Sequence, residues 1–397
     1  MPALPTRPYS NGDATAAVRP CANPDGVSGV PLKAESSNCL TATPLREAKI
    51  ECLPSTWGDP LRIGNVEIEN RLILAPMAGI TDRPFRSLCR RLGAGLAVSE
   101  MLSANPALRG SRKSRERADH RGEPGPIAVQ IAGSDPAWMA EAARASVDQG
   151  AEIIDINLGC PAKKVCKVAA GSALLRDEPL VARILAAVVN AVPVPVTLKT
   201  RTGWSPETRN LRRIAKIAKE SGIAMLAVHG RTRACGYSGL AEFDSLRALR
   251  AESDLPRELP LAANGDIDTP ERAQWVLQYT GADAVMIGRA ARGRPWLFRE
   301  IGHYLSTGQR LPPPAPAWVC ATLLGHLEAL YELYGTARGL RVARKHIGWY
   351  LHAQWPAADP HRNAILARIN RAETTALQTK LVRDLFAEWP PALEDAA

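Results

Sequence analysis

The chain has 397 residues, of which 46% are hydrophobic and 23% charged, and its formal net charge is +10 at pH 7. This composition is typical of a globular protein with a large core, and it excludes a membrane-spanning helix because no apolar run reaches about 18 residues. The first residues also lack the basic and apolar regions of a signal peptide, so we expect a cytoplasmic protein that has no membrane partner.

The eight cysteines indicate neither a disulfide framework nor a metal site. No two of them form a CxxC pair, and none has metal-ligand spacing with a histidine. We therefore expect reduced thiols and no bound metal. The positive charge favours an acidic partner such as nucleic acid, although the charge alone is more typical of a solvated basic surface.

Residues 1–57 are rich in Pro, Ser, Asn, Gly and Ala and have no hydrophobic periodicity, which predicts a disordered N-terminal extension or a misassigned start. From residue 58 to residue 306, short apolar runs alternate with amphipathic segments that begin next to proline and end at glycine. Eight strands alternating with helices predict a (β/α)₈ TIM barrel, with a doubly wound open sheet as the alternative because the second run is weak. The eight runs are residues 71–79, 96–102, 126–133, 153–160, 195–203, 225–232, 260–267 and 284–291.

Polar residues gather late in these predicted strands. In a barrel the late positions meet at the C-terminal mouth, where active sites of this fold are built. The clustering therefore indicates an enzyme, whatever its chemistry. The residues are Pro76, Met77, Ala78, Ser99, Glu100, Gln130, Asn157, Cys160, Lys199, Arg201, His229, Arg231, Asn264, Gly265, Asp266, Gly288 and Arg289.

The last two predicted strands indicate a phosphate site. Gly265, Gly288 and Arg289 follow strands seven and eight, where backbone amides and helix starts bind anions in this fold. Tight turns alone would explain one glycine, but the pair together with an arginine favours phosphate. Since no other nucleotide-binding motif occurs, the phosphate is expected to belong to a cofactor at the barrel mouth.

Lys199 narrows the choice of cofactor. A lysine at the end of the apolar run "PVTL" is costly to bury unless it meets an anion or an electron-rich ring edge. Flavin mononucleotide (FMN) has both a phosphate and such an edge. From position alone, a Schiff-base lysine and a structural lysine whose stem is buried remain equal alternatives.

Several ordered motifs resemble the tRNA-dihydrouridine synthase family, most closely its bacterial B subfamily. The resemblance runs from about Leu61 to the C-terminus, and it implies an FMN-dependent barrel with a C-terminal helical domain that reduces a uridine of the tRNA D-loop with NADPH. The motifs are "LAPMAGITDRPFR" (74–86), "VSEML" (98–102), "VQIAGSDP" (129–136), "DINLGCPAKKV" (155–165), "AGSALL" (170–175), "HGRTR" (229–233), "ANGDI" (263–267) and "IGRAARGRPW" (287–296).

The resemblance also implies roles for single residues. Cys160 matches the proton donor, and Asn157 matches a residue near the substrate base. Residues matching the flavin contacts are Pro76, Met77, Ala78, Gln130, Lys199, His229, Asn264, Gly265, Asp266, Gly288 and Arg289.

The chemistry agrees with a thiol at position 160. Hydride delivery to C6 of uracil leaves an enolate that must be protonated at C5 from the opposite face. A thiol of pKa about 8.5 is still mostly protonated at neutral pH, whereas a carboxylic acid is usually ionised. A buried structural cysteine is the alternative for Cys160. Cys166 departs from the family pattern, and the sequence leaves its role open between spectator and oxidation partner.

Beyond the barrel the pattern becomes helical. Residues 307–317 are a predicted proline-rich linker, and residues 318–397 read as three or four amphipathic helices that match the RNA-binding domain of the family. Arg341, Arg344 and Lys345 lie in its basic stretch, which alone would be read as a solvated face. With Lys163 and Arg231 at the active-site rim, they are expected to contact tRNA, whose target base must be extruded into the pocket.

Two other functions remain compatible with the sequence. A flavin-dependent barrel that reduces a free pyrimidine would need no basic helical tail. A non-catalytic RNA-binding protein on an inactive barrel would need no flavin. We expect a tRNA-modifying enzyme that acts as a monomer.

Overall fold

The computed structural model describes residues 60–166, 168–251, 257–355 and 360–387. The predicted N-terminal extension, residues 1–57, lies outside them. Within these ranges, no helix is both long enough and apolar enough to cross a membrane.

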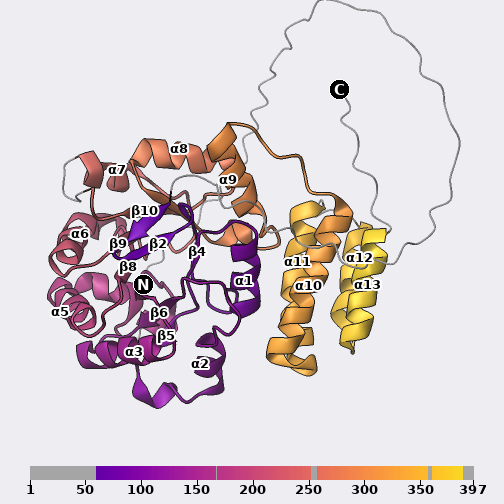
Figure 1. Ribbon diagram of the computed structural model, residues 1–397, viewed down its shortest axis with the longest axis horizontal. Coiled ribbons are helices and arrows are strands. Elements are labelled where there is room, and N and C mark those ends of the chain that lie inside the picture. Colours follow the sequence, from indigo (N-terminus) through magenta and orange to yellow (C-terminus); the bar gives the residue numbers. More distant parts are fainter. Residues whose placement is uncertain (1–59, 167, 252–256, 356–359, 388–397) are drawn as a thin grey trace, which may run out of the picture. The chain divides into compact units, whose positions relative to one another are not determined.

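A parallel sheet organises the first part of the described chain (Figure 1). In order around the sheet, the described strands are β4, β3, β11, β10, β9, β8, β7, β6 and β5. Their bounds are β3 (Leu72–Leu74), β4 (Leu96–Ala97), β5 (Leu102–Ser103), β6 (Ala128–Ala132), β7 (Ile153–Leu158), β8 (Val196–Arg201), β9 (Met225–His229), β10 (Leu261–Asn264) and β11 (Ala284–Ile287).

The predicted barrel is confirmed, with one difference in its second strand. The expected run 96–102 is divided into β4, which pairs with β3, and β5, which pairs with β6. A parallel bridge between Val98, which follows β4, and Ala128, the first residue of β6, closes the ring. The interruption coincides with the buried polar pair Ser99 and Glu100, whose side chains accept hydrogen bonds from the backbone N–H groups of Gln130 in β6 and of Gly79.

Inside the barrel, the side chains near the strand starts are apolar, and those near the strand ends are mostly polar. Ile153, Met225 and Ala262, at the strand starts, belong to an apolar cluster inside the barrel. This cluster also contains residues of a hairpin, β1 (Leu61–Ile63) and β2 (Val66–Ile68). Since every second residue points to the same face, the polar positions near the strand ends lie above this cluster.

Helices follow the strands and bury their apolar faces against the outside of the sheet. Asp82, Asp135 and Thr269 accept backbone hydrogen bonds at helix starts, and Gly281 ends a helix in the left-handed conformation, as the sequence signals predict. The helices are α1 (Arg83–Arg91), α2 (Arg112–Arg117), α3 (Pro136–Asp148), α4 (Lys163–Cys166), α5 (Glu178–Val189), α6 (Leu211–Glu220), α7 (Asp244–Ala251), α8 (Pro270–Thr280) and α9 (Leu297–Thr307).

The C-terminal described helices pack together and against α1 (Figure 1). They are α10 (Pro316–Tyr334), α11 (Thr336–Gln354), α12 (Pro360–Arg371) and α13 (Thr375–Ala387). Their core includes Leu88 of α1 and Trp296. At Gly293, which has φ +71°, an added Cβ would lie 2.2 Å from the Trp349 carbonyl, so α11 approaches the barrel closely.

The expected domain boundaries stay a prediction. Residues 308–315, which connect α9 to α10, fall within the predicted linker. The assignment of the C-terminal helices to RNA binding also stays a prediction.

Candidate active site

A cavity of about 1250 Å³ opens at the C-terminal ends of the strands. It is lined by every residue predicted to contact the cofactor, together with Cys160, Asn157 and Arg231. The predicted residues in its wall are Pro76, Met77, Ala78, Gln130, Asn157, Cys160, Lys199, His229, Arg231, Asn264, Gly265, Asp266, Gly288 and Arg289.

The remaining predicted RNA contacts lie outside this cavity. Lys163 is exposed at the start of α4, and Arg341 is exposed on α11. Arg344 is half-buried on the same helix. Lys345 donates a hydrogen bond to the carbonyl of Gly79, so its ammonium already has a partner in the protein. Their contacts with RNA stay predictions.

A series of buried hydrogen bonds supports the floor of the cavity. Asp155 accepts from Thr197 Oγ1 at 2.6 Å and from Gln130 Nε2 at 2.6 Å. Gln130 Oε1 in turn accepts from Asn157 Nδ2 at 2.7 Å. Asn157 Oδ1 accepts from the backbone N–H of Cys160 at 3.0 Å. The series fixes both amide side chains and anchors the backbone that carries Cys160.

Asp155 makes stability depend on pH. Burial raises the pKa of its carboxyl from 3.8 to about 6, against the lowering effects of Thr197, Gln130 and Lys199. Between these values the folded state binds the proton more tightly than the unfolded chain, so stability falls as the pH rises through this window and is level above it. Asp155→Asn should remove this dependence. We expect the free energy of unfolding of the wild type, relative to that of the variant, to be up to about 3 kcal/mol higher at pH 4 than at pH 8. Urea unfolding from pH 4 to 8 measures it, and parallel stability curves would contradict it.

Cys160 is half-buried at the cavity wall. Burial raises the pKa of its thiol above the usual value, so the group is protonated at neutral pH. Its carbonyl accepts from Ser172 Oγ at 2.8 Å, and the Cys166 thiol lies 3.7 Å from the same oxygen. Cys166 thus packs on the backbone of Cys160, and its function stays open.

Lys199 is held toward the centre of the cavity. Its ammonium donates to Asn264 Oδ1 at 2.9 Å, while Asn264 Nδ2 donates to the carbonyl of Met286 at 2.7 Å. Burial lowers the pKa of Lys199 to about 8, and the nearby charge of Arg201 adds to this effect. The side chain therefore remains mostly charged at pH 7, in a fixed orientation.

Asp266 holds two arginines in the cavity wall. Its carboxylate pairs with both terminal nitrogens of Arg231, at 3.0 and 2.5 Å, and with Arg289 at 3.1 Å. The preceding Gly265 has φ +124°, and an added Cβ would lie 2.7 Å from Ala241 Cβ, so no larger residue fits there. Arg289 keeps 42% of its side chain exposed and can bind an anion.

The described lining of the cavity has an excess of positively charged side chains. Among its described lining residues, six are arginine or lysine and two are aspartate. His229 is neutral, because burial and the surrounding cations lower its pKa far below the usual value. A phosphorylated ligand would offset the excess positive charge.

Two residues contribute to the site in ways the sequence did not reveal. The sequence identifies Arg201 only as a polar residue late in a strand, but its side chain is buried and donates to the carbonyls of Gly159, Thr232 and Gly236. It thereby fixes the loop that carries Tyr237. The Tyr237 ring is 57% exposed and lies 4.6 Å from the Arg289 guanidinium carbon. Arg201 lies two residues after Lys199 in β8, and this spacing places both side chains on the same face of the strand.

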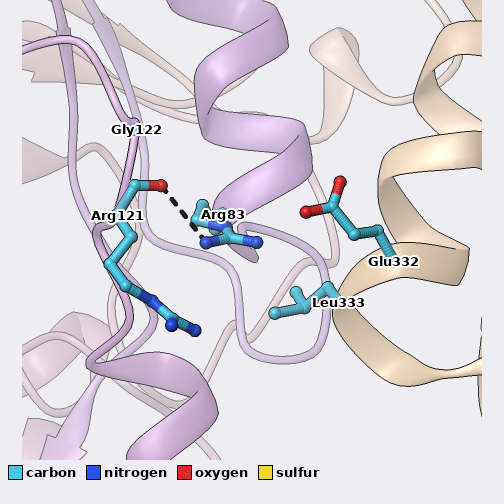
Figure 2. Close-up of a pocket in the computed structure, with 5 residues that line it drawn as sticks. All are labelled: Arg83, Arg121, Gly122, Glu332 and Leu333. Atoms are coloured by element: carbon cyan, nitrogen blue, oxygen red, sulfur yellow. Dashed lines mark hydrogen bonds between the residues drawn. The ribbon is translucent and has the colours of Figure 1, made fainter.

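A second cavity, of about 440 Å³, lies where α1 faces the end of α10 (Figure 2). Arg83 donates to the carbonyl of Arg121 at 3.2 Å and pairs with Asp119 at 3.2 Å. Figure 2 shows Glu332 and Leu333 of α10 on the opposite side. None of the predicted site residues lines this cavity, so we assign the candidate active site to the larger one.

The larger cavity combines a thiol, an amine and several guanidinium groups. In the part of the chain that the structure describes, no group of three or more His, Cys, Asp or Glu side chains could hold a metal ion. The cavity brings a protonated thiol, an oriented lysine and an anion-binding end together. This arrangement can bind a phosphorylated ring cofactor and deliver a proton to a substrate beside it.

Comparisons with known proteins agree with one family. A family model described as dihydrouridine synthase (Dus) matches residues 73–386. The chain is 58% identical over 341 residues to tRNA-dihydrouridine synthase B of Xanthomonas axonopodis pv. citri. The aligned residues make up 85% of this chain and 100% of that relative. The enzyme of the same name from Pseudomonas aeruginosa is 57% identical over 328 residues, covering 83% of this chain and 96% of that one.

Similarity to solved structures is weaker. A 2-naphthoyl-CoA reductase complex gives a TM-score of 0.49 at 13% identity, covering 63% of this chain and 52% of that one. A histamine dehydrogenase from Rhizobium sp. 4-9 gives 0.48 at 13% identity, covering 69% and 51%. These scores are too low to support an inference about function.

Proposed function

The chain belongs to the dihydrouridine synthase family, and on this premise we propose that it reduces the C5–C6 double bond of a uridine in the D-loop of tRNA. The observation that carries the proposal is the thiol of Cys160, protonated at neutral pH, in the same cavity as Lys199 and the Arg289 end. A proton donor, a cofactor site and a strongly basic wall are what this reaction requires.

The residues of the cavity fit FMN as the cofactor. Lys199 and Gln130 would bind the polar edge of the ring, and Arg289 with Gly265 and Gly288 would hold the phosphate. When bound and reduced by NADPH, FMN would supply the hydride for C6 of uracil. The donor set supports this fit, because Lys199 and Arg289 line the cavity and the carboxylate of Asp266 is paired with Arg231 and Arg289.

Cys160 would donate its proton to C5 of the base. Asn157 would position Cys160 for this step. Its side-chain oxygen accepts from the backbone N–H of Cys160, and its side-chain nitrogen donates to Gln130 Oε1. A thiol whose pKa is raised by burial stays protonated until the base arrives. Asn157 is thus assigned to positioning as well as to the predicted contact with the base.

Recognition of tRNA is assigned to the basic surface outside the cavity. Lys163 beside the mouth and Arg341 on α11 are exposed and can reach phosphates. A base inside a folded RNA cannot reach the cavity floor, so the uridine must be extruded. Backbone contacts would select the RNA, and the cavity would then check for uracil.

The proposal is tested with purified protein, FMN, NADPH and a tRNA transcript that lacks modifications. We expect dihydrouridine in the D-loop, detected by mass spectrometry of nuclease fragments, and none when FMN or NADPH is omitted. Binding of the tRNA should weaken steeply as salt is raised. Reduction of free uracil or orotate without any reduction of tRNA would overturn the proposal in favour of a pyrimidine dehydrogenase.

A further inference from the structure

The turn Met77–Asp82 forms one side of the candidate active site. Met77, Ala78 and Ile80 line the cavity. Within the turn, the N–H of Met77 donates to Thr81 Oγ1 at 2.9 Å, and the N–H of Thr81 donates to the Met77 carbonyl at 3.0 Å. A shift of this turn would therefore change the shape of the wall against which the cofactor is expected to lie.

The barrel holds the turn through the N–H of Gly79. This N–H donates to the carboxylate of Glu100 at 2.5 Å. Glu100 is 4% exposed and pairs with Arg117 at 2.9 Å. Gly79 itself has φ +75°, a conformation that presents its two backbone polar groups to different neighbours.

The C-terminal helices hold the same residue through its carbonyl. Lys345 of α11 donates to the oxygen of Gly79. Burial lowers the pKa of Lys345, and the negative charges of Asp82 and Glu100 oppose this effect. The amino group therefore lies among acids of the barrel, 266 residues along the chain from the carbonyl that it binds.

Two further side-chain contacts join α10 and α11 to the barrel. The Tyr334 hydroxyl donates to Asp82 Oδ2 at 2.9 Å, while Asp82 Oδ1 accepts from the N–H of Phe85 at the start of α1. Arg338 pairs with Glu116 of α2. Tyr334 thus holds the same turn as Lys345, whereas Arg338 joins α11 to α2.

We propose that Lys345 is a positioning residue, which joins the C-terminal helices to the cofactor wall by binding the Gly79 carbonyl, in place of the phosphate contact expected from the sequence. The proposal rests on the proposed function for the identity of the cofactor and the RNA. It follows that α11 carries two kinds of cation: Arg341 faces outward for RNA, and Lys345 faces inward and shapes the site.

The test compares Lys345→Met with Lys345→Arg and with Arg341→Met on the same helix. Hydrogen exchange of the peptide that contains Gly79 is measured in the FMN-free protein, and the dissociation constants for FMN and for a tRNA transcript are measured separately. For Lys345→Met we expect exchange at the turn and the dissociation constant for FMN each to rise about tenfold, the loss typical of one charge-assisted hydrogen bond. Lys345→Arg should restore most of both. Arg341→Met should weaken tRNA binding and leave the turn unchanged.

Tyr334→Phe removes the link to Asp82 while keeping the ring, so it provides a second test if Lys345→Met does not fold. It should also speed exchange in the turn. Unchanged exchange and FMN binding in the folded variants, with only tRNA binding weakened, would overturn the inference and leave the proposed function standing. If the wild type neither binds nor reduces tRNA, the proposed function fails, but the exchange result still decides the role of Lys345.

Discussion

Replacing Cys160 with alanine is expected to lower dihydrouridine formation by about 100-fold or more while FMN binding and NADPH oxidation continue. The thiol lies in the cavity wall, but its side chain makes none of the hydrogen bonds that support the floor. Removing the sulfur should therefore eliminate the proton donor and leave the cofactor site intact. Stopped-flow absorbance follows cofactor reduction, and mass spectrometry of the tRNA follows the product.

Cys166→Ala is the matched control, because this second thiol lies on the same segment and packs on the Cys160 carbonyl. It should retain product formation. Cys160→Ser should be nearly as inactive as Cys160→Ala, since a hydroxyl is a much weaker acid than a thiol. Because burial raises the pKa of Cys160, proton donation in the wild type should persist above neutral pH and fall only beyond the usual thiol range. Full product formation by Cys160→Ala would end the proton-donor assignment.

The barrel could be predicted from the sequence because its strands are buried on both sides and read as short apolar runs. The residues of β7 and β9 are all buried, and both strands lie inside predicted runs. The break between β4 and β5 could not be predicted. It depends on where Ser99 and Glu100 find hydrogen-bond partners, and those partners, Gln130 and Gly79, are distant in sequence.

The cavity could be predicted for a related reason: parallel strands bring their C-terminal ends to one rim, so late polar residues must meet there. The buried hydrogen bonds that support the cavity floor could not be predicted in the same way. Asp155 lies inside an apolar run, and only the register of β6 with β7 shows that it faces Gln130. The hydrogen bond from Lys345 to Gly79 could not be predicted, because helical spacing does not show which face of α11 meets the barrel.

Replacing Lys199 with methionine is expected to weaken FMN binding by about 100-fold at pH 7, the upper range for a hydrogen bond to a charged group. Lys199 is held by Asn264 in the cavity, and the methionine would leave Asn264 Oδ1 without this donor. The pH dependence makes the prediction specific. Since the pKa of Lys199 is lowered to about 8, the free protein loses this charge as the pH rises through 8.

The dissociation constant of the wild type for FMN should therefore rise between pH 7 and pH 9, as measured by fluorescence quenching. In Lys199→Met the same constant should be weak and nearly independent of pH across this window. Lys199→Arg keeps a charge that does not titrate there, so it should bind FMN at pH 9 about as well as at pH 7. Equal pH profiles for the wild type and Lys199→Met would show that another group governs FMN binding and that Lys199 does not meet the ring edge.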